Sequence, residues 1–180
     1  MRTGRDGAQA LHEALRLQGG TAAEVLADFA ADAERLARPG PAQVAAAGPR
    51  ARGHELEYEL LLEMILEGYR LHYDEPLVLR TDDVDLSLLL GDQLYALGLS
   101  RLAALGDLDA VAELADVISL AAQAHAACDR ELAHAVWDAG AACVGWGSSE
   151  AHSEAKARAR AHDPGAPEAL RAAACAVRGE

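Results

Sequence analysis

Residues 84–105 read VDLSLLLGDQLYALGLSRLAAL, a run that is apolar on almost every side of a helix. A helix with so little polar surface is normally surrounded by other helices. We therefore expect this helix to lie at the centre of a helical bundle. Asp82 or Asp83 is placed to cap its N-terminus, and Gly106 followed by Asp107 ends it and begins the next helix.

The segments on either side of this run also have helical spacing. Residues 55–73, ELEYELLLEMILEGYRLHY, place leucines on one face and glutamates on the other, and Pro76 follows. Residues 108–126 form an amphipathic pattern, and further helices are expected at about 130–145, at 149–162 and after Pro167. The chain is therefore predicted to be an all-α bundle of six to eight helices.

The N-terminal part predicts a pair of shorter helices and a linker. Residues 8–18 form a short helix that Gly19 and Gly20 end. Thr21 and Glu24 match a capping box for a second helix, which stops before Pro39. Its apolar positions are Val25, Leu26, Phe29 and Leu36. We thus expect a helical pair over 1–38, a Pro/Gly-rich linker or a poorly formed helix over 39–53, and the main bundle over 54–180.

Composition limits the classes of function. The 180 residues carry a net charge of -13, and aromatic residues make up 4% of the chain. The shortage of Lys and Arg disfavours binding to nucleic acid or to an anionic membrane. No apolar run reaches the roughly 20 residues that a membrane-spanning helix needs, so no membrane insertion is expected. The residues up to 18 lack an apolar signal core, and the three cysteines lack metal-type spacing, which predicts a cytoplasmic protein.

Residues 64–106 resemble part of the isoprenoid (polyprenyl) diphosphate synthase family. The segment LHYDE at 71–75 lies where that family has its first aspartate-rich motif. LLGDQLYA at 89–96 is similar to the helix of the family that opens with a Gly-Asp pair, and LGD at 105–107 also falls where that family has a break. This resemblance implies a truncated isoprenoid-synthase-like bundle.

Other features of the family are absent from the sequence. The resemblance implies two aspartate clusters that hold Mg²⁺ around a diphosphate, but no second cluster occurs in the C-terminal half. The basic segment that grips the other diphosphate is also missing, and Lys156 is the only lysine in the chain. The small non-catalytic subunit of two-component prenyl diphosphate synthases resembles the large subunit's helices and Gly-Asp segment but lacks the aspartate motifs. The resemblance to it implies association with a catalytic prenyl synthase subunit.

A shortened acidic loop remains as a candidate magnesium site. Asp74, Glu75, Asp82 and Asp83 offer the oxygen ligands that Mg²⁺ prefers. The alternative interpretation is a solvated loop followed by a helix start, where acidic residues are favoured by the exposed N–H groups. No catalytic residue and no certain cofactor are predicted.

Asp92 and His72 are predicted to be buried polar residues with a structural role. Asp92 interrupts an apolar helix, and a buried carboxylate needs a partner. His72 is expected to pair with a carboxylate. Candidate partners for Asp92 are Arg70, Arg80 and Arg101.

Three functions stay open at this level. The first is a non-catalytic helical protein that acts by forming a homodimer or by binding a catalytic prenyl synthase subunit. The second is a small Mg²⁺-dependent protein or enzyme that binds an isoprenoid or diphosphate. The third is an unrelated stand-alone helical protein, because alanine- and leucine-rich helices resemble one another readily.

Overall fold

The computed structural model describes residues 2–28 and 36–180, and within these ranges it is all-α, as predicted. The helices are α1 (Gly4–Gln18), α2 (Thr21–Glu24), α3 (Pro41–Ala47), α4 (Glu55–Tyr73), α5 (Val84–Ala104), α6 (Leu108–Ala126), α7 (Arg130–Trp146), α8 (Glu150–Arg160) and α9 (Ala166–Arg178), with a 3₁₀ turn, η2 (Pro49–Ala51). None of the helices described is long and apolar enough to cross a membrane.

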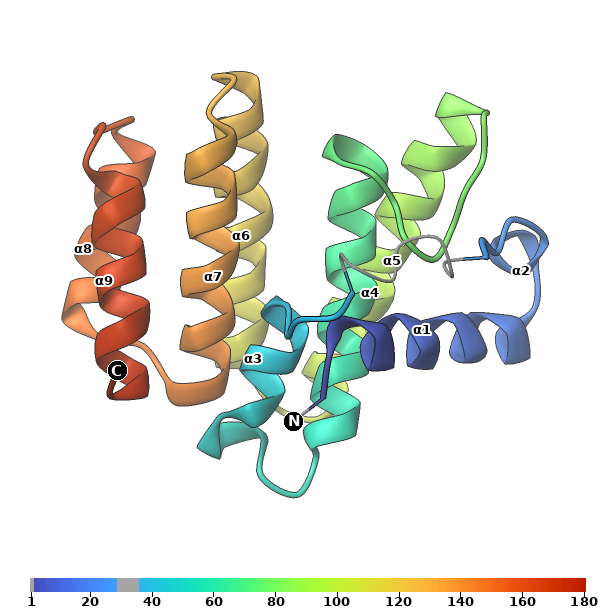
Figure 1. Ribbon diagram of the computed structural model, residues 1–180, viewed down its shortest axis with the longest axis horizontal. Coiled ribbons are helices and arrows are strands. Elements are labelled where there is room, and N and C mark those ends of the chain that lie inside the picture. Colours follow the sequence, from blue (N-terminus) through green and yellow to red (C-terminus); the bar gives the residue numbers. More distant parts are fainter. Residues whose placement is uncertain (1, 29–35) are drawn as a thin grey trace.

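Three helical hairpins form the body of the fold. The pairs α4–α5, α6–α7 and α8–α9 stand roughly upright beside one another, and α1 lies across α4 (Figure 1). Short α3 packs against both α4 and α7 and so joins the first two hairpins. The C-terminal hairpin is attached mainly through the contact of α9 with α7.

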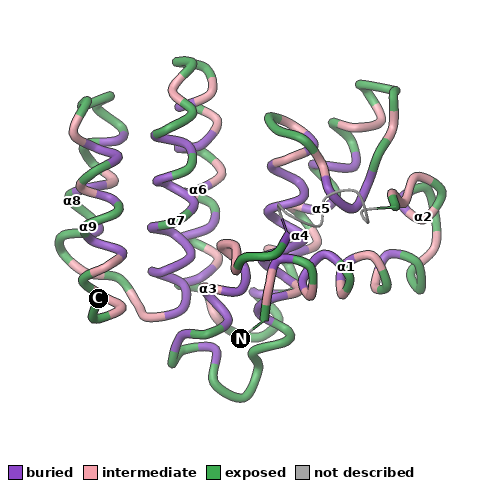
Figure 2. The backbone as a smooth tube through the Cα atoms, viewed as in Figure 1, coloured by how far each residue is buried: buried purple, intermediate pink, exposed green. Residues whose placement is uncertain are grey.

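The centre of the core differs from the sequence prediction. Burial concentrates on α4 and α7 (Figure 2), where 12 of 19 and 12 of 17 residues are buried. The apolar helix α5 was expected at the centre, but only Leu90, Gly91, Leu94, Gly98 and Leu102 of its 21 residues are buried. The prediction was wrong because the glutamates of α4 accept hydrogen bonds from partners inside the fold, which lets α4 be buried. Helix α5, in contrast, packs mainly against α4 and leaves its other side exposed.

Residues 39–53, expected to be a linker, contain α3 and η2. Gly40 precedes Pro41, whose fixed φ suits the first turn of a helix. Ala42, Ala45 and Ala46 are buried in the main core. Gly48 lies so close to α7 that a Cβ placed on it would be 2.2 Å from the carbonyl oxygen of Gly145. Small residues therefore make this segment a packed part of the bundle.

The second N-terminal helix is shorter than predicted. Gly20, rather than Thr21, is the N-cap residue, and α2 ends at Glu24. Leu26 then forms an isolated antiparallel bridge with Leu79, in which Ala27 N–H donates to Val78 O at 2.8 Å. Over residues 25–27, hydrogen bonds to residues 78–80 thus take the place of hydrogen bonds within a helix. The expectation for Phe29 lies outside the described residues.

Asp107 caps α6 as predicted and also ties that helix to other elements. Its Oδ1 accepts from Ala110 N–H at 3.0 Å and from Arg50 at 2.8 Å, and its Oδ2 accepts from Tyr58 Oη at 2.6 Å. Burial alone would raise the pKa of Asp107, but these hydrogen bonds lower it below its ordinary value. Its stabilising contribution is therefore present at neutral pH and lost as the pH falls through the folded-state pKa.

We expect Asp107→Ala to lower the free energy of unfolding by about 2 kcal/mol, because it removes an N-cap and leaves the Tyr58 hydroxyl without its acceptor. Urea denaturation at neutral pH measures this. Asp109→Ala is the matched control, since Asp109 lies in the first turn of the same helix with its side chain 89% exposed. A loss of equal size in both variants would show that only the negative charge near the helix start matters.

Candidate functional site

Three glutamates of α4 lie on one face, four residues apart, and point into the fold. Glu59, Glu63 and Glu67 are 2%, 2% and 0% exposed. Buried carboxylates are costly unless hydrogen bonds or opposite charges compensate them. Gln43 donates to Glu59 at 3.1 Å, and Arg2 also donates to Glu59. The sequence pattern had placed these glutamates on the solvent side of the helix, so this part of the interpretation was wrong.

Glu67 holds the chain that follows α4. Its Oε1 accepts the backbone N–H of Leu77 at 2.9 Å, of Val78 at 2.6 Å and of Leu79 at 3.0 Å. The same carboxylate pairs with Arg70, whose Nη1 lies 3.1 Å from Glu67 Oε2. This anchor draws residues 77–79 into the core and sets the position of the acidic residues on either side of them.

Arg70 neutralises the middle of the glutamate row. Its Nη1 donates to Glu63 Oε1 at 2.7 Å, and its side chain is 12% exposed. Burial disfavours the cation, but Glu63 and Glu67 raise the pKa of Arg70 above its ordinary value. Burial raises the pKa of Glu63, and Arg70 offsets only part of that rise. This network is a structural support beneath the acidic loop.

The four acidic residues predicted to hold Mg²⁺ are distributed around the loop from 74 to 83. Asp83 is the N-cap of α5, and its Oδ1 accepts from Asp85 N–H at 3.0 Å and Leu86 N–H at 3.1 Å. Asp74 lies 3.9 Å from Arg130, and Glu75 lies 3.8 Å from Arg80. Asp82 is exposed. No three of these four carboxylates come within 4.8 Å of one another, so they do not form a preassembled metal site. Binding of Mg²⁺ to this loop stays a prediction.

His72 and Asp92 lie beside each other, but Asp92 is not buried. Its side chain is 72% exposed, which corrects the expectation of a buried carboxylate, while that of His72 is 15% exposed. His72 Nε2 is 3.2 Å from Asp92 Oδ1, although the geometry is not that of a hydrogen bond. A Cβ on Gly91 would lie 2.7 Å from the His72 ring, so glycine here allows α4 and α5 to approach closely.

Aromatic side chains fill the space between α4 and its neighbours. Tyr69 Oη lies 2.8 Å from His125 Nε2, and its ring is 5.3 Å from that of Trp137. The rings of Tyr73 and His125 stack at 4.7 Å. Burial, together with the positive charge of Arg130, lowers the pKa of His125 below its ordinary value. This cluster joins the first two hairpins by packing and contains no arrangement of nucleophile and base.

The outward side of α5 carries exposed apolar side chains. Leu89 is 66% exposed, and Leu88 is 40% exposed. Ala96 and Ala103 follow Leu89 at intervals of seven residues, and both are exposed. Positions seven residues apart lie on the same side of a helix. The helix therefore presents one row that contains a leucine and then two small side chains.

A second polar cluster, which the sequence did not reveal, joins α6 to α8. Glu113 Oε1 lies 2.8 Å from His152 Nε2, and Glu113 Oε2 accepts from Lys156 Nζ at 2.6 Å. Lys156 also donates to Asp116 at 2.8 Å. Burial raises the pKa of Glu113, but the hydrogen bonds from His152 and Lys156 lower it below its ordinary value. These residues are 39 and 43 positions apart in sequence, so no local spacing could have linked them.

Cys143 completes this cluster. Its side chain is buried, with 7% exposed. Burial, with Glu113 nearby, raises the pKa of the thiol to about 12. In contrast Cys128 is exposed and Cys175 is partly exposed.

Comparison with protein-family models, with curated proteins and with solved structures finds no match for this chain. The resemblance to prenyl diphosphate synthases therefore rests on residues 64–106 alone.

Proposed function

We propose that this chain is a non-catalytic helical protein that acts by association, and that the outward face of α5 binds the same face of a second copy. The observation that carries this proposal is the exposed row of Leu89, Ala96 and Ala103 on a helix with only five buried residues. The exposed polar residues Gln93 and Ser100 lie between these three side chains on the same face, so the row offers separate apolar contacts, and exposed apolar side chains grouped on one face are typical of interaction sites. The lack of a second aspartate cluster and of the basic diphosphate-binding segment in the sequence supports a role without catalysis.

The row suits an antiparallel pair of helices. Homodimers are commonly built around a twofold axis, where the same surface of each copy meets its counterpart. With that axis beside Ala96, Leu89 of one copy lies against the small side chain of Ala103 in the other. A large residue thus meets a small one at both ends, and two alanines meet in the middle. Close helix packing requires this kind of interdigitation.

Charge favours the antiparallel arrangement over the parallel one. Asp82, Asp83 and Asp85 are all exposed at the N-terminal end of α5, whereas the C-terminal end has Arg101. Parallel helices would bring the two acidic ends together, and antiparallel helices keep them apart. The net charge of -13 on each copy still opposes association, and added salt screens that repulsion. The dimer is therefore expected to strengthen as salt increases.

Sedimentation velocity across a range of protein and salt concentrations tests this proposal. We expect a weak, reversible dimer, because one 21-residue helix, about 31 Å long, provides an interface at or below the lower end of the usual size range. Leu89→Asp is expected to give a monomer with unchanged helicity, because it places two carboxylates in the apolar contact.

Leu17→Asp is the matched control, since Leu17 is 71% exposed on α1 and should leave the dimer intact. A wild-type chain that remains monomeric at the highest concentration and salt would overturn homodimerisation. Co-sedimentation only after a catalytic prenyl synthase subunit is added would instead favour the heteromeric association that the resemblance implies. Equal loss of the dimer in both variants would show that α5 is not the contact face.

A further inference from the structure

Three metal-ligating side chains from three different helices converge inside the C-terminal half of the fold. Glu113 comes from α6, Cys143 from α7 and His152 from α8, and they are 7%, 7% and 3% exposed. One ligand atom from each lies within 4.8 Å of the other two. In the part of the chain that the structure describes, no other three His, Cys, Asp or Glu residues converge in this way.

Backbone features help to position two of these ligands, Cys143 and His152. Gly140 lets α7 approach α6, because a Cβ there would lie 2.2 Å from Val117 Cγ2, and this close contact is one helical turn from Cys143. Ser149 caps α8 by accepting from the N–H of His152 at 3.1 Å, which places His152 in the first turn of that helix. The ligands are therefore carried by helices rather than by loops, and such positions are well defined.

A cavity adjoins two of the three ligands and provides access. Its volume is about 300 Å³, and Glu113 and Cys143 form part of its wall. The remainder of the wall includes the polar residues Asp116, Ser148 and Lys156 together with the apolar residues Ala110, Ala112 and Val144. A metal ion held by the three side chains would thus have a fourth position open to this cavity, and a water molecule would occupy it. Three protein ligands and one open position are typical of zinc sites that are not closed.

The surrounding charges suit a divalent cation. A thiolate and a carboxylate together neutralise two positive charges, and a neutral imidazole adds none. Lys156 bonds to Glu113 Oε2, whereas Glu113 Oε1 faces His152 Nε2. Lys156 can therefore remain on the outer oxygen while the inner oxygen binds a metal, in the way that ligating carboxylates are usually hydrogen-bonded by a second residue. Asp116 lies 2.8 Å from Lys156 and also 2.8 Å from Arg160, so it shares its negative charge between these two cations.

We propose that Glu113, Cys143 and His152 form a zinc-binding site, with the fourth position facing the cavity. Sulfur and nitrogen ligands favour Zn²⁺ and disfavour Mg²⁺, which prefers oxygen ligands alone. On binding, the thiol of Cys143 releases its proton to solvent, and the imidazole proton of His152 moves to Nδ1 so that Nε2 can bind the ion. This site is separate from α5 and does not depend on the proposed dimer.

Titration of the metal-free full-length chain with Co²⁺ tests the site directly, because Co²⁺ replaces Zn²⁺ and its spectrum reports geometry and ligands. We expect one equivalent of Co²⁺ to bind, with the strong visible bands of tetrahedral coordination and a near-ultraviolet thiolate-to-cobalt band. Zn²⁺ should displace Co²⁺ and abolish both, and Mg²⁺ should not. Zn²⁺ should also raise the melting temperature, because it joins α8 to α6 and α7.

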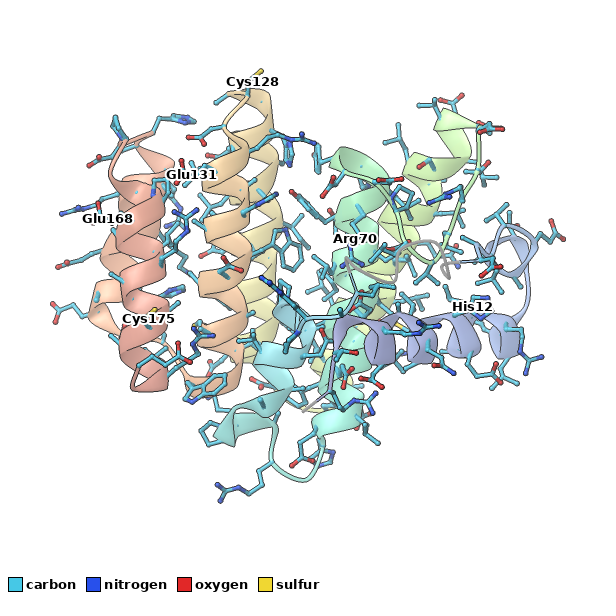
Figure 3. The ribbon with its side chains drawn as sticks, viewed as in Figure 1. His12, Arg70, Cys128, Glu131, Glu168 and Cys175 are labelled. Atoms are coloured by element: carbon cyan, nitrogen blue, oxygen red, sulfur yellow. The ribbon has the colours of Figure 1, made fainter. Side chains whose placement is uncertain are left out.

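Two cysteine variants assign the ligand. Cys128 and Cys175 lie far from each other, at the α6–α7 turn and on α9 (Figure 3), and neither belongs to the three-ligand group. The Cys128→Ser/Cys175→Ser double variant keeps Cys143 as the only thiol, and we expect it to retain the full cobalt spectrum. Cys143→Ser should lose the thiolate band. Loss of a residue that only hydrogen-bonds a metal ligand typically weakens metal binding roughly tenfold to hundredfold. Because His152 would bind the ion itself, His152→Asn should weaken Zn²⁺ binding by more than this.

The double variant also keeps the test decisive if Cys143→Ser does not fold, because its two changes lie outside the three-ligand group. Absence of the thiolate band from the double variant would overturn the proposal, as would octahedral Co²⁺ bound weakly at the surface. Retention of the band in a folded Cys143→Ser variant would overturn it as well. His162→Asn is the control for histidine, since His162 is exposed and should not affect binding.

Discussion

Glu67→Ala is expected to lower the free energy of unfolding by about 3–5 kcal/mol, the largest effect of any single substitution considered for this chain. The carboxylate is 0% exposed and accepts three consecutive backbone N–H groups, from Leu77, Val78 and Leu79. Its removal leaves those donors unsatisfied in the core and takes one of two carboxylates from Arg70. Chemical denaturation monitored by circular dichroism measures the loss.

Glu57→Ala is the control for this prediction. Glu57 lies on the same helix with its side chain 48% exposed, and its Oε2 lies 3.3 Å from His54 Nδ1. We expect a change within about 0.5 kcal/mol, as is usual for surface positions. Glu67→Gln separates the two roles of Glu67, because the amide oxygen can still accept N–H bonds but carries no charge. Hydrogen exchange at Leu77–Leu79 should then quicken less in Glu67→Gln than in Glu67→Ala. Equal losses in the Glu57 and Glu67 alanine variants would contradict the buried network.

Gly48→Ala should destabilise the protein by about 2–3 kcal/mol, because the added methyl group overpacks the contact between η2 and α7. The methyl carbon would lie 2.2 Å from the carbonyl oxygen of Gly145, and backbone atoms cannot move aside as a side chain can. The φ of Gly48 is -74°, which any residue adopts, so the loss would come from the contact and not from backbone strain. Thermal and urea denaturation give the value.

Gly40→Ala provides the comparison within the same segment. Gly40 has a φ of -100°, and a Cβ there would meet only Gln43 Oε1, at 3.3 Å. We expect little change or a small gain in stability, since replacing glycine reduces the conformational entropy of the unfolded chain. If 39–53 were a flexible linker, both substitutions would behave like Gly40→Ala. A neutral Gly48→Ala would therefore restore the linker interpretation.

The helices were largely predictable because their signals are local. Asp83 and Asp107 cap α5 and α6 as their positions indicate, and α4 ends at Tyr73, ahead of Pro76. A cap or a proline acts on backbone groups within a few residues, so the sequence contains the whole interaction. The helix expected after Thr21 does not continue over residues 25–28, because Leu26 pairs with Leu79, a partner that the local pattern does not show.

The candidate sites were less predictable, because each depends on residues that only the fold brings together. Asp74, Glu75, Asp82 and Asp83 are close in sequence, yet no three of them converge. The ligands Glu113, Cys143 and His152 do converge, although they lie on three helices and have no recognisable spacing. Asp92 illustrates the same limit, since an apolar surrounding sequence does not establish burial, and its side chain is 72% exposed.

The sequence by itself determined the all-α class and most helix limits, since periodicity, caps and helix-breaking residues act over a few residues. The tertiary structure alone decided which helix is central. Glutamates usually mark a solvent-facing side, but Glu59, Glu63 and Glu67 are buried because Arg70, Gln43 and the backbone of 77–79 satisfy them. Leucines usually mark a core, but Leu89 is exposed because no described element covers that face of α5. Burial depends on partners from elsewhere in the chain, and those partners are a property of the folded molecule.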